Sequence, residues 1–170
     1  NQQYLEIVKA FKDETKDRAG VLPMVGVISL SPDEVRGRVE AAAEVGITDF
    51  QISFPAWGAV SDSEAFSYLH YICDRYPTLR FMHYNNGLRS HKKLFGRQYE
   101  KISAEIPNLV AVKYPGATIR EIQDVITRDL PLQFFFLENG YGYASMVGEA
   151  SLLISLCNIN HRLAFEYFQA

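Results

Sequence analysis

Residues 109–113 read Leu-Val-Ala-Val-Lys, an apolar run that ends in a single lysine. Residues 81–84 have the same form, because they read Phe-Met-His-Tyr and end in a tyrosine. Short and almost continuously apolar runs are typical of strands that are covered on both faces, as in a parallel sheet between layers of helices. The sequence therefore predicts two buried strands that end in reactive side chains, Tyr84 and Lys113.

Apolar runs and amphipathic segments alternate along the whole chain. We expect strands at residues 24–28, 50–54, 79–84, 109–113, 134–137 and 152–155. Helices are expected at 33–45, 62–75, 91–106, 119–128 and 141–148, with one more at each end of the chain. No linker or low-complexity tract interrupts this alternation, which predicts a single domain over residues 1–170.

Local capping patterns support the expected helices. Three helix starts carry a serine or threonine followed three residues later by a glutamate, which is the capping-box pattern. The pairs are Ser31 with Glu34, Ser61 with Glu64, and Thr118 with Glu121. Gly46 follows the last apolar position of its helix and is expected at the C-terminal cap.

Repeated βα units with right-handed crossovers predict a parallel sheet, either an open doubly wound sheet or a closed (β/α)8 barrel. Gly140-Tyr141-Gly142 follows a strand but lacks the third glycine of the dinucleotide-binding turn. The better prediction is therefore an α/β fold of the TIM (β/α)8 barrel type. In such a barrel the chemistry takes place at the carboxyl ends of the strands, where Tyr84, Lys113 and Glu138 fall.

The composition excludes several classes of partner. The chain is 48% hydrophobic with a formal net charge of -3, and it has no basic stripe, so nucleic acid is not an expected partner. No apolar run approaches the roughly 20 residues that span a membrane, and the N-terminus has no signal-peptide pattern, so we expect a cytoplasmic protein. Cys73 and Cys157 lack metal-binding spacing and are expected to be buried thiols, with no metal and no cofactor.

The lysine and the tyrosine together suggest covalent chemistry. Burial disfavours the charged form of a lysine, so a lysine at the end of a buried strand is a candidate amine nucleophile that attacks a ketone and forms a Schiff base. A neighbouring tyrosine would carry the protons that this step requires. Each residue alone is equally well explained by packing, as a lysine extending from a strand end and a tyrosine in the core. Their pairing and spacing favour the chemical interpretation.

The chain resembles the family of dihydrodipicolinate synthases and N-acetylneuraminate lyases, which are Schiff-base aldolases and lyases. The resemblance is carried by residues 84–90, Tyr-Asn-Asn-Gly-Leu-Arg-Ser, by Leu94, and by the run that ends at Lys113. It implies that residue 84 ends the fifth barrel strand and residue 113 the sixth. It is weaker but collinear elsewhere: Gly26 in the third strand, Phe54-Pro55 after the fourth, and residues 152–155 as the eighth.

On this alignment the first two barrel strands, with the Gly-Thr-Thr-Gly-Glu turn that binds the keto-acid carboxylate in the family, are absent from the sequence. A complete barrel of this type has about 250 residues. We therefore expect an incomplete barrel made of about strands 3 to 8, belonging to a larger protein. Such a sheet would have two unpaired edges.

The resemblance also implies roles for single residues. Lys113 would form the Schiff base with pyruvate or a related 2-keto acid, and Tyr84 would shuttle protons. Arg89 would bind a substrate carboxylate through its guanidinium, although an exposed arginine at a helix start is an equal alternative. Trp57, Glu138 and Ile154 are further expected substrate contacts, with a subunit interface as the alternative for Trp57 and a solvated carboxylate at a strand end as an equal alternative for Glu138. The family is commonly tetrameric, so a homo-oligomer is expected, as a tetramer or a dimer.

Several positions differ from the pattern of the synthases. Ala56-Trp57 stands where those enzymes carry two tyrosines, Gly87 replaces the usual proline, and Tyr114-Pro115 follows the lysine. These differences favour an aldolase or dehydratase acting on a sugar acid over the lysine-biosynthetic enzyme. The alternative is a non-catalytic member of the family that binds a keto acid or a sugar acid.

Overall fold

Six strands form one sheet in the same order as in the chain. The computed structural model describes residues 2–170. The strands are β1 (Met24–Gly26), β2 (Asp49–Ile52), β3 (Arg80–Tyr84), β4 (Leu109–Lys113), β5 (Gln133–Phe136) and β6 (Ser151–Leu152). Every neighbouring pair is parallel, which confirms the predicted succession of βα units.

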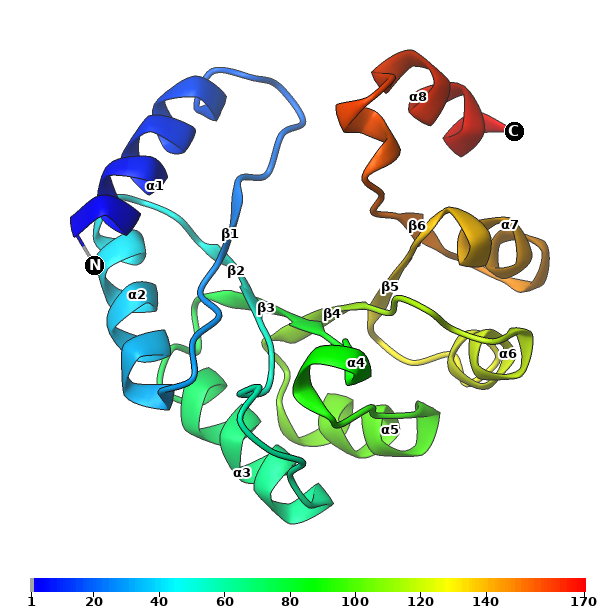
Figure 1. Cartoon of the computed structure of the whole chain (residues 1–170), viewed down its shortest axis with the longest axis horizontal. Helices are drawn as coiled ribbons and strands as arrows, with labels where there is room; N and C mark the ends of the chain where they lie inside the picture. Colours follow the sequence, from blue (N-terminus) through cyan, green and yellow to red (C-terminus); the bar gives the residue numbers. More distant parts are fainter. Residues whose placement is uncertain (1) are drawn as a thin grey trace.

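Helices connect and cover the strands. They are α1 (Gln2–Thr15), α2 (Pro32–Glu44), α3 (Asp62–Cys73), α4 (Gly87–Ser90), α5 (Gly96–Glu105), α6 (Ile119–Ile126), α7 (Glu138–Val147) and α8 (His161–Gln169), with a short 3-10 helix, η1 (Leu156–Asn158). Figure 1 shows the longer helices in an arc around the convex side of the sheet, from α1 in blue to α7 in orange. None of the helices in residues 2–170 combines the length and the apolar character needed to cross a membrane.

The core lies between the sheet and this arc of helices. Alternate strand residues point to the helices and are buried, among them Val25, Phe50, Phe81, Val112 and Phe134. Full burial of a valine or phenylalanine side chain contributes about 1.5–3 kcal/mol. The apolar runs that predicted the strands are thus the residues that attach the helices to the sheet.

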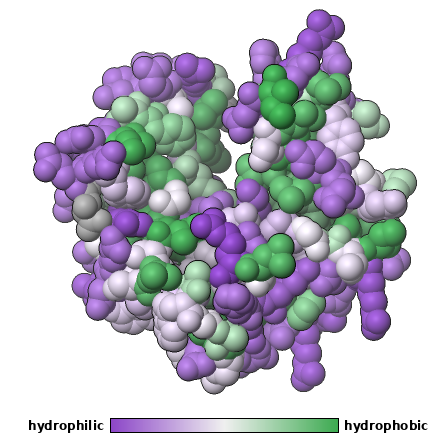
Figure 2. Space-filling view, viewed as in Figure 1, coloured by the Kyte–Doolittle hydropathy of each residue, from purple (hydrophilic) through white to green (hydrophobic). Residues whose placement is uncertain are grey.

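The sheet is an open part of a barrel. Within residues 2–170, β1 pairs only with β2 and β6 only with β5, so the two edges do not meet. In Figure 1, α1 and α8 face each other across the resulting opening, and Figure 2 shows a deep hollow there. The structure confirms the predicted incomplete barrel with two free edges.

The helix caps agree with the sequence at two of the three predicted positions. Ser61 with Glu64 and Thr118 with Glu121 form complete capping boxes. Ser31 caps α2 through the Glu34 amide, but the Glu34 carboxylate does not return to the Ser31 amide. That carboxylate binds the Ser29 hydroxyl and, at 2.8 Å, the Arg38 guanidinium. A charged partner on the next turn therefore replaces the expected backbone contact.

Gly46 adopts the predicted left-handed conformation after α2, with φ of 87°.

Two other predictions were wrong. The helix expected at 91–106 begins only at Gly96, because Asn85 binds both backbone groups of Leu94 and holds the preceding segment out of a helix. Cys157 is exposed in η1 and not buried, whereas Cys73 is buried as predicted, and burial raises the pKa of its thiol.

Candidate active site

The strand register places Tyr84 and Lys113 side by side. Tyr84 of β3 is the register partner of Lys113 of β4, Lys113 is paired in turn with Phe135 of β5, and Phe135 with Ser151 of β6. These four residues form one row across the concave face of the sheet, because side chains that share a register position point to the same face. The row stands at the carboxyl ends of β3 and β4.

The two predicted reactive side chains are in contact. Lys113 Nζ lies 4.7 Å from the centre of the Tyr84 ring, and both residues are half-buried. The Tyr84 hydroxyl oxygen accepts a hydrogen bond of 3.1 Å from the Asn86 amide. Because this bond uses a lone pair of the phenol oxygen, the phenol proton stays free to donate toward a ligand beside Lys113. The arrangement combines an amine nucleophile with a proton carrier.

A buried hydrogen-bond network fixes the loop that follows β3. The Asn85 side chain donates to Leu94 O at 2.8 Å and accepts from Leu94 N at 3.0 Å. The Tyr114 hydroxyl donates to the same Leu94 carbonyl at 3.1 Å, and Asn85 N donates to Lys113 O at 2.9 Å. Burial raises the pKa of Tyr114, which keeps its hydroxyl protonated as a donor. The loop around the two reactive residues is therefore tied to both strands.

His83 points away from the site and into the helical layer. Its Nδ1 lies 2.8 Å from the Tyr99 hydroxyl, and its Nε2 is buried without a partner within residues 2–170. Complete burial lowers the pKa of His83 to about 3, because the cation would be desolvated there. His83 is thus a neutral core residue, although it directly precedes Tyr84 in the chain.

A cavity of about 620 Å³ opens beside Tyr84. Its polar side chains come from Tyr84, Asn86, His91 and Lys93. Leu88, Pro115 and Leu137 supply apolar parts of its wall, from the loops after β3, β4 and β5. Lys113 is not among the lining residues of this cavity, but its Nζ lies 4.7 Å from the centre of the Tyr84 ring, which lines it. The cavity is large enough for a small organic acid.

The other four predicted site residues do not line this cavity. Arg89 is exposed in α4, and Trp57 is 70% exposed in the loop after β2. Glu138 is half-buried at the first position of α7, and Ile154 is half-buried two residues after β6. All four follow strand ends, and among residues 2–170 no side-chain hydrogen bond or ion pair joins them to Tyr84 or Lys113.

Sequence reasoning missed Asn86 and His91, which line the cavity with Tyr84. Asn86 is two residues after the tyrosine, a spacing at which an amide can reach back to the preceding side chain. His91 was expected to begin a helix. Instead it ends α4 with a left-handed backbone, φ of 54°.

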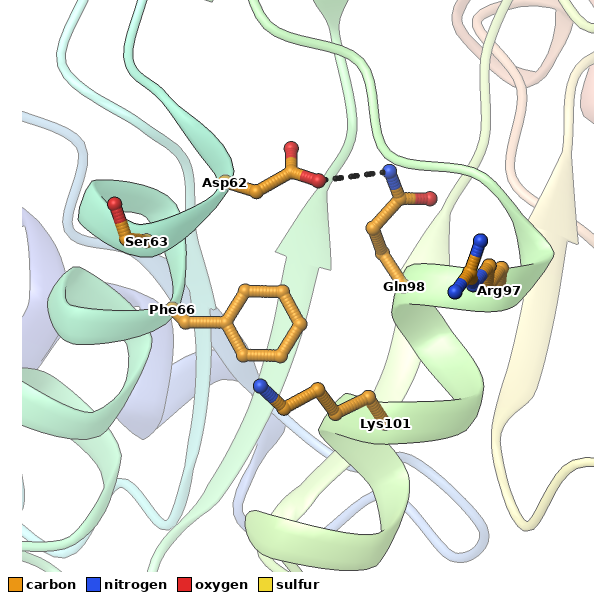
Figure 3. Close-up of a pocket in the computed structure, with 6 residues that line it drawn as sticks. All are labelled: Asp62, Ser63, Phe66, Arg97, Gln98 and Lys101. Carbon is orange, nitrogen blue, oxygen red and sulfur yellow. Dashed lines mark hydrogen bonds between the residues drawn. The ribbon is translucent and has the colours of Figure 1, made fainter.

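A second cavity, of about 510 Å³, lies on the outer wall between α3 and α5 (Figure 3). Two of its three charged side chains, Asp62 and Lys101, have partners, and the third, Arg97, is exposed. Asp62 pairs with Lys92 and accepts from Gln98 at 3.3 Å, and Lys101 lies 4.5 Å from the centre of the Phe66 ring. This cavity lies between two helices on the side of the sheet opposite Lys113. In the described part of the chain no cluster of three or more histidine, cysteine or acidic residues is arranged to hold a metal ion.

Comparisons with known proteins agree with this architecture. No protein-family profile matches the chain, and no curated protein matches it. Among solved structures, a putative dihydrodipicolinate synthetase from Pseudomonas aeruginosa has a TM-score of 0.87 at 18% identity, with 100% of this chain and 58% of that chain covered. A monomeric dihydrodipicolinate synthase variant has a TM-score of 0.85 at 16% identity, with 100% and 59% covered.

A third solved structure holds a ligand. YagE, a prophage protein of the dihydrodipicolinic acid synthase family from E. coli K12 in complex with pyruvate, has a TM-score of 0.83 at 14% identity, with 99% of this chain and 62% of that chain covered. The chain thus spans about three fifths of the length of these proteins. Over that length, it has the incomplete (β/α)8-barrel fold of the dihydrodipicolinate synthase family.

Proposed function

We propose that this protein belongs to the dihydrodipicolinate synthase and N-acetylneuraminate lyase family and is a lyase or aldolase that forms a Schiff base with pyruvate or a related 2-keto acid. The observation that carries the proposal is the contact between Lys113 Nζ and the Tyr84 ring, at the carboxyl ends of adjacent parallel strands. An amine and a phenol in this arrangement are the two groups that Schiff-base formation requires.

The reaction begins when the neutral amine of Lys113 attacks the ketone carbon. The carbonyl oxygen takes up a proton from the Tyr84 hydroxyl, and the resulting phenolate takes one proton from the positively charged nitrogen, which gives a neutral carbinolamine. Tyr84 then donates that proton to the carbinolamine hydroxyl, which leaves as water, and the nitrogen lone pair forms the iminium joined to Lys113. The iminium withdraws electrons from the neighbouring carbon, so a bond at that carbon can be formed or broken. Hydrolysis then releases the product and the amine.

The remaining predicted residues have supporting roles in this proposal. Arg89 binds a substrate carboxylate, and its exposure in a four-residue helix leaves the guanidinium free to turn toward the mouth of the barrel. Trp57, Glu138 and Ile154 follow the carboxyl ends of β2, β5 and β6, where a longer substrate would extend. None of them takes part in forming the Schiff base.

Borohydride trapping tests the proposal. The intact protein is incubated with pyruvate or with a panel of 2-keto sugar acids, reduced, and analysed by peptide mass spectrometry. We expect a reduced adduct on Lys113 and none in Lys113→Arg, which keeps a cation over the Tyr84 ring but cannot form the iminium. Lys101→Arg is the matched control, because Lys101 also lies over an aromatic ring, 4.5 Å from the centre of Phe66, but on the outer wall between α3 and α5. Folded protein that binds these acids without an adduct would instead support the non-catalytic alternative.

A further inference from the structure

Asn86 stands at the start of α4 and directs its side chain to Tyr84. Asparagine is one of the preferred residues at an N-terminal cap, where its side-chain oxygen accepts a hydrogen bond from a backbone amide of the first turn. Among the described residues, no backbone amide of α4 forms this bond with Asn86. Its side-chain nitrogen instead donates to the Tyr84 hydroxyl oxygen at 3.1 Å. The residue thus gives up the local interaction that its type favours for a contact with the reactive tyrosine.

Backbone hydrogen bonds hold both residues of this contact. The Asn86 carbonyl accepts hydrogen bonds of 3.0 Å from the backbone nitrogens of Arg89 and Ser90 and from the Ser90 hydroxyl. The Tyr84 carbonyl accepts one of 2.9 Å from the backbone nitrogen of Asn86 and one of 3.1 Å from the Ser53 hydroxyl. The donor is therefore in place before any reaction begins, and a donor of this kind needs no reorganisation when charge develops on its acceptor.

The proposed reaction places a negative charge on the Tyr84 oxygen for part of the cycle. When the phenol O–H bond breaks, its proton joins the carbonyl oxygen of the keto acid and the bonding electron pair stays on the phenol oxygen. The charge disappears when a proton from the nitrogen of Lys113 returns to that oxygen. A hydrogen bond to an ionised acceptor is roughly twice as strong as one between neutral groups. The Asn86 amide therefore stabilises the phenolate more than the phenol, which accelerates the proton transfer.

Other cationic groups near Tyr84 are committed elsewhere. Lys113 must be neutral in order to attack the ketone, so its charge is not available to the phenolate at that step. Lys93 pairs with Glu121 at 2.9 Å. Among residues 2–170, Asn86 is the one residue whose side chain forms a hydrogen bond with the Tyr84 hydroxyl. An uncharged amide is thus the group that faces the developing charge.

We propose that Asn86 is a positioning residue for the proton transfer by Tyr84, because its side-chain amide orients the phenol and stabilises the phenolate formed while the Schiff base is built on Lys113. This inference rests on the proposed reaction at Lys113. Asn86 acts through the Tyr84 hydroxyl, so its effect on the rate must disappear when that hydroxyl is removed.

A double-mutant cycle with Tyr84→Phe tests the inference. The rate of borohydride-trapped adduct formation on Lys113 is measured for the intact protein over a range of pyruvate concentrations. Asn86→Leu removes the amide at similar volume and is made in the parent protein and in Tyr84→Phe. Asn86→Asp, in the parent protein, keeps the shape but replaces the donor by a carboxylate that only accepts. Asn158→Leu, at an exposed position of η1, is the matched control, and thermal unfolding verifies that every variant folds.

We expect the rate at saturating pyruvate to fall about tenfold in Asn86→Leu and further in Asn86→Asp, whose carboxylate repels the phenolate. The pyruvate concentration that gives half of this rate should change by less than about twofold, because the amide acts on the proton transfer and not on binding. In Tyr84→Phe, adding Asn86→Leu should change the remaining rate by less than about twofold.

Three results would overturn the inference while the adduct on Lys113 is still formed. They are an equal fold loss from Asn86→Leu in both backgrounds, a rate for Asn86→Leu within about twofold of the parent protein, and a rate for Asn86→Asp equal to that of the parent protein. The absence of any adduct in the folded parent protein is a different result. It would reject the proposed lyase activity itself, and with it the reaction that Asn86 serves.

Discussion

Lys113 Nζ lies over the face of the Tyr84 ring, 4.7 Å from its centre. The contact follows from the register, because the two residues are partners on β4 and β3 and point to the same face of the sheet. The electron-rich ring face attracts the ammonium form of the lysine. Tyr84 therefore has two parts with separate tasks: its ring holds the lysine, and its hydroxyl is placed to carry protons.

Replacing Tyr84 by phenylalanine separates these two tasks. Tyr84→Phe keeps the ring beneath Lys113 and removes the hydroxyl, so we expect the rate of borohydride-trapped adduct formation to fall by about 100-fold or more. Unfolding in urea should change by less than about 0.5 kcal/mol, because the ring packing is kept. Tyr143→Phe on the exposed side of α7 is the matched control. An adduct rate within threefold of the parent protein would show that Tyr84 is not the proton carrier.

The loop after β3 should depend on Asn85 for stability. Asn85→Ala removes the donor to Leu94 O and leaves the buried Leu94 amide without its acceptor. We expect a loss of about 2–3 kcal/mol in the free energy of unfolding, measured by urea denaturation. Asn139→Ala, in an exposed position of α7, should cost less than about 0.5 kcal/mol. Equal effects of the two substitutions would mean that the network contributes nothing beyond an ordinary surface amide.

Two glycines, Gly37 inside α2 and Gly46 just after it, should respond in opposite directions to alanine. At Gly46, φ is 87° and an added Cβ would come within 2.8 Å of Lys12 Nζ, so Gly46→Ala should destabilise by about 1–2 kcal/mol. Gly37 lies inside α2 and a Cβ there would meet nothing within 4 Å, so Gly37→Ala should stabilise by about 0.5–1 kcal/mol. Thermal unfolding of both variants measures the difference, and a stabilising Gly46→Ala would contradict the left-handed cap.

The free energy of unfolding should decrease as the pH is lowered, because of His83. Burial lowers its pKa from 6.5 to about 3 in the folded protein, so below pH 6.5 the unfolded chain binds a proton that the folded chain does not. The free energy of unfolding therefore has its full value above pH 6.5 and decreases progressively between about pH 6.5 and 3. One such group gives a slope that approaches about 1.4 kcal/mol per pH unit.

Urea unfolding at pH 7, 6 and 5 measures this slope above the range in which carboxylates titrate. His83→Gln removes the titrating group and can still bond to the Tyr99 hydroxyl, so its free energy of unfolding should be flatter over the same interval. Parallel pH profiles for the parent protein and the variant would exclude His83 as the source of the pH dependence.

Local patterns in the sequence predicted the parts of the fold that depend on neighbouring residues. The strand that ends at Lys113 was predicted without error in its bounds, and Ser61 and Thr118 begin their helices as their capping patterns indicate. Each of these features is decided within a few residues of chain, by burial on both faces of a strand or by a side chain that caps its own helix. For this reason the sequence alone predicted that Tyr84 and Lys113 end buried strands.

Contacts between residues far apart in the chain decided the features that local patterns did not predict. Leu94 cannot join a helix because its backbone bonds to Asn85, nine residues earlier, and the Glu34 carboxylate leaves its capping box for Ser29 and Arg38. Phe135 joins the row of Lys113 only through the register of β5. The sequence by itself determined which residues end the strands. Only the pairing of the strands and the path of the loop after β3 decided that Tyr84 holds Lys113 and shares a cavity with His91, because those contacts join residues that no local spacing relates.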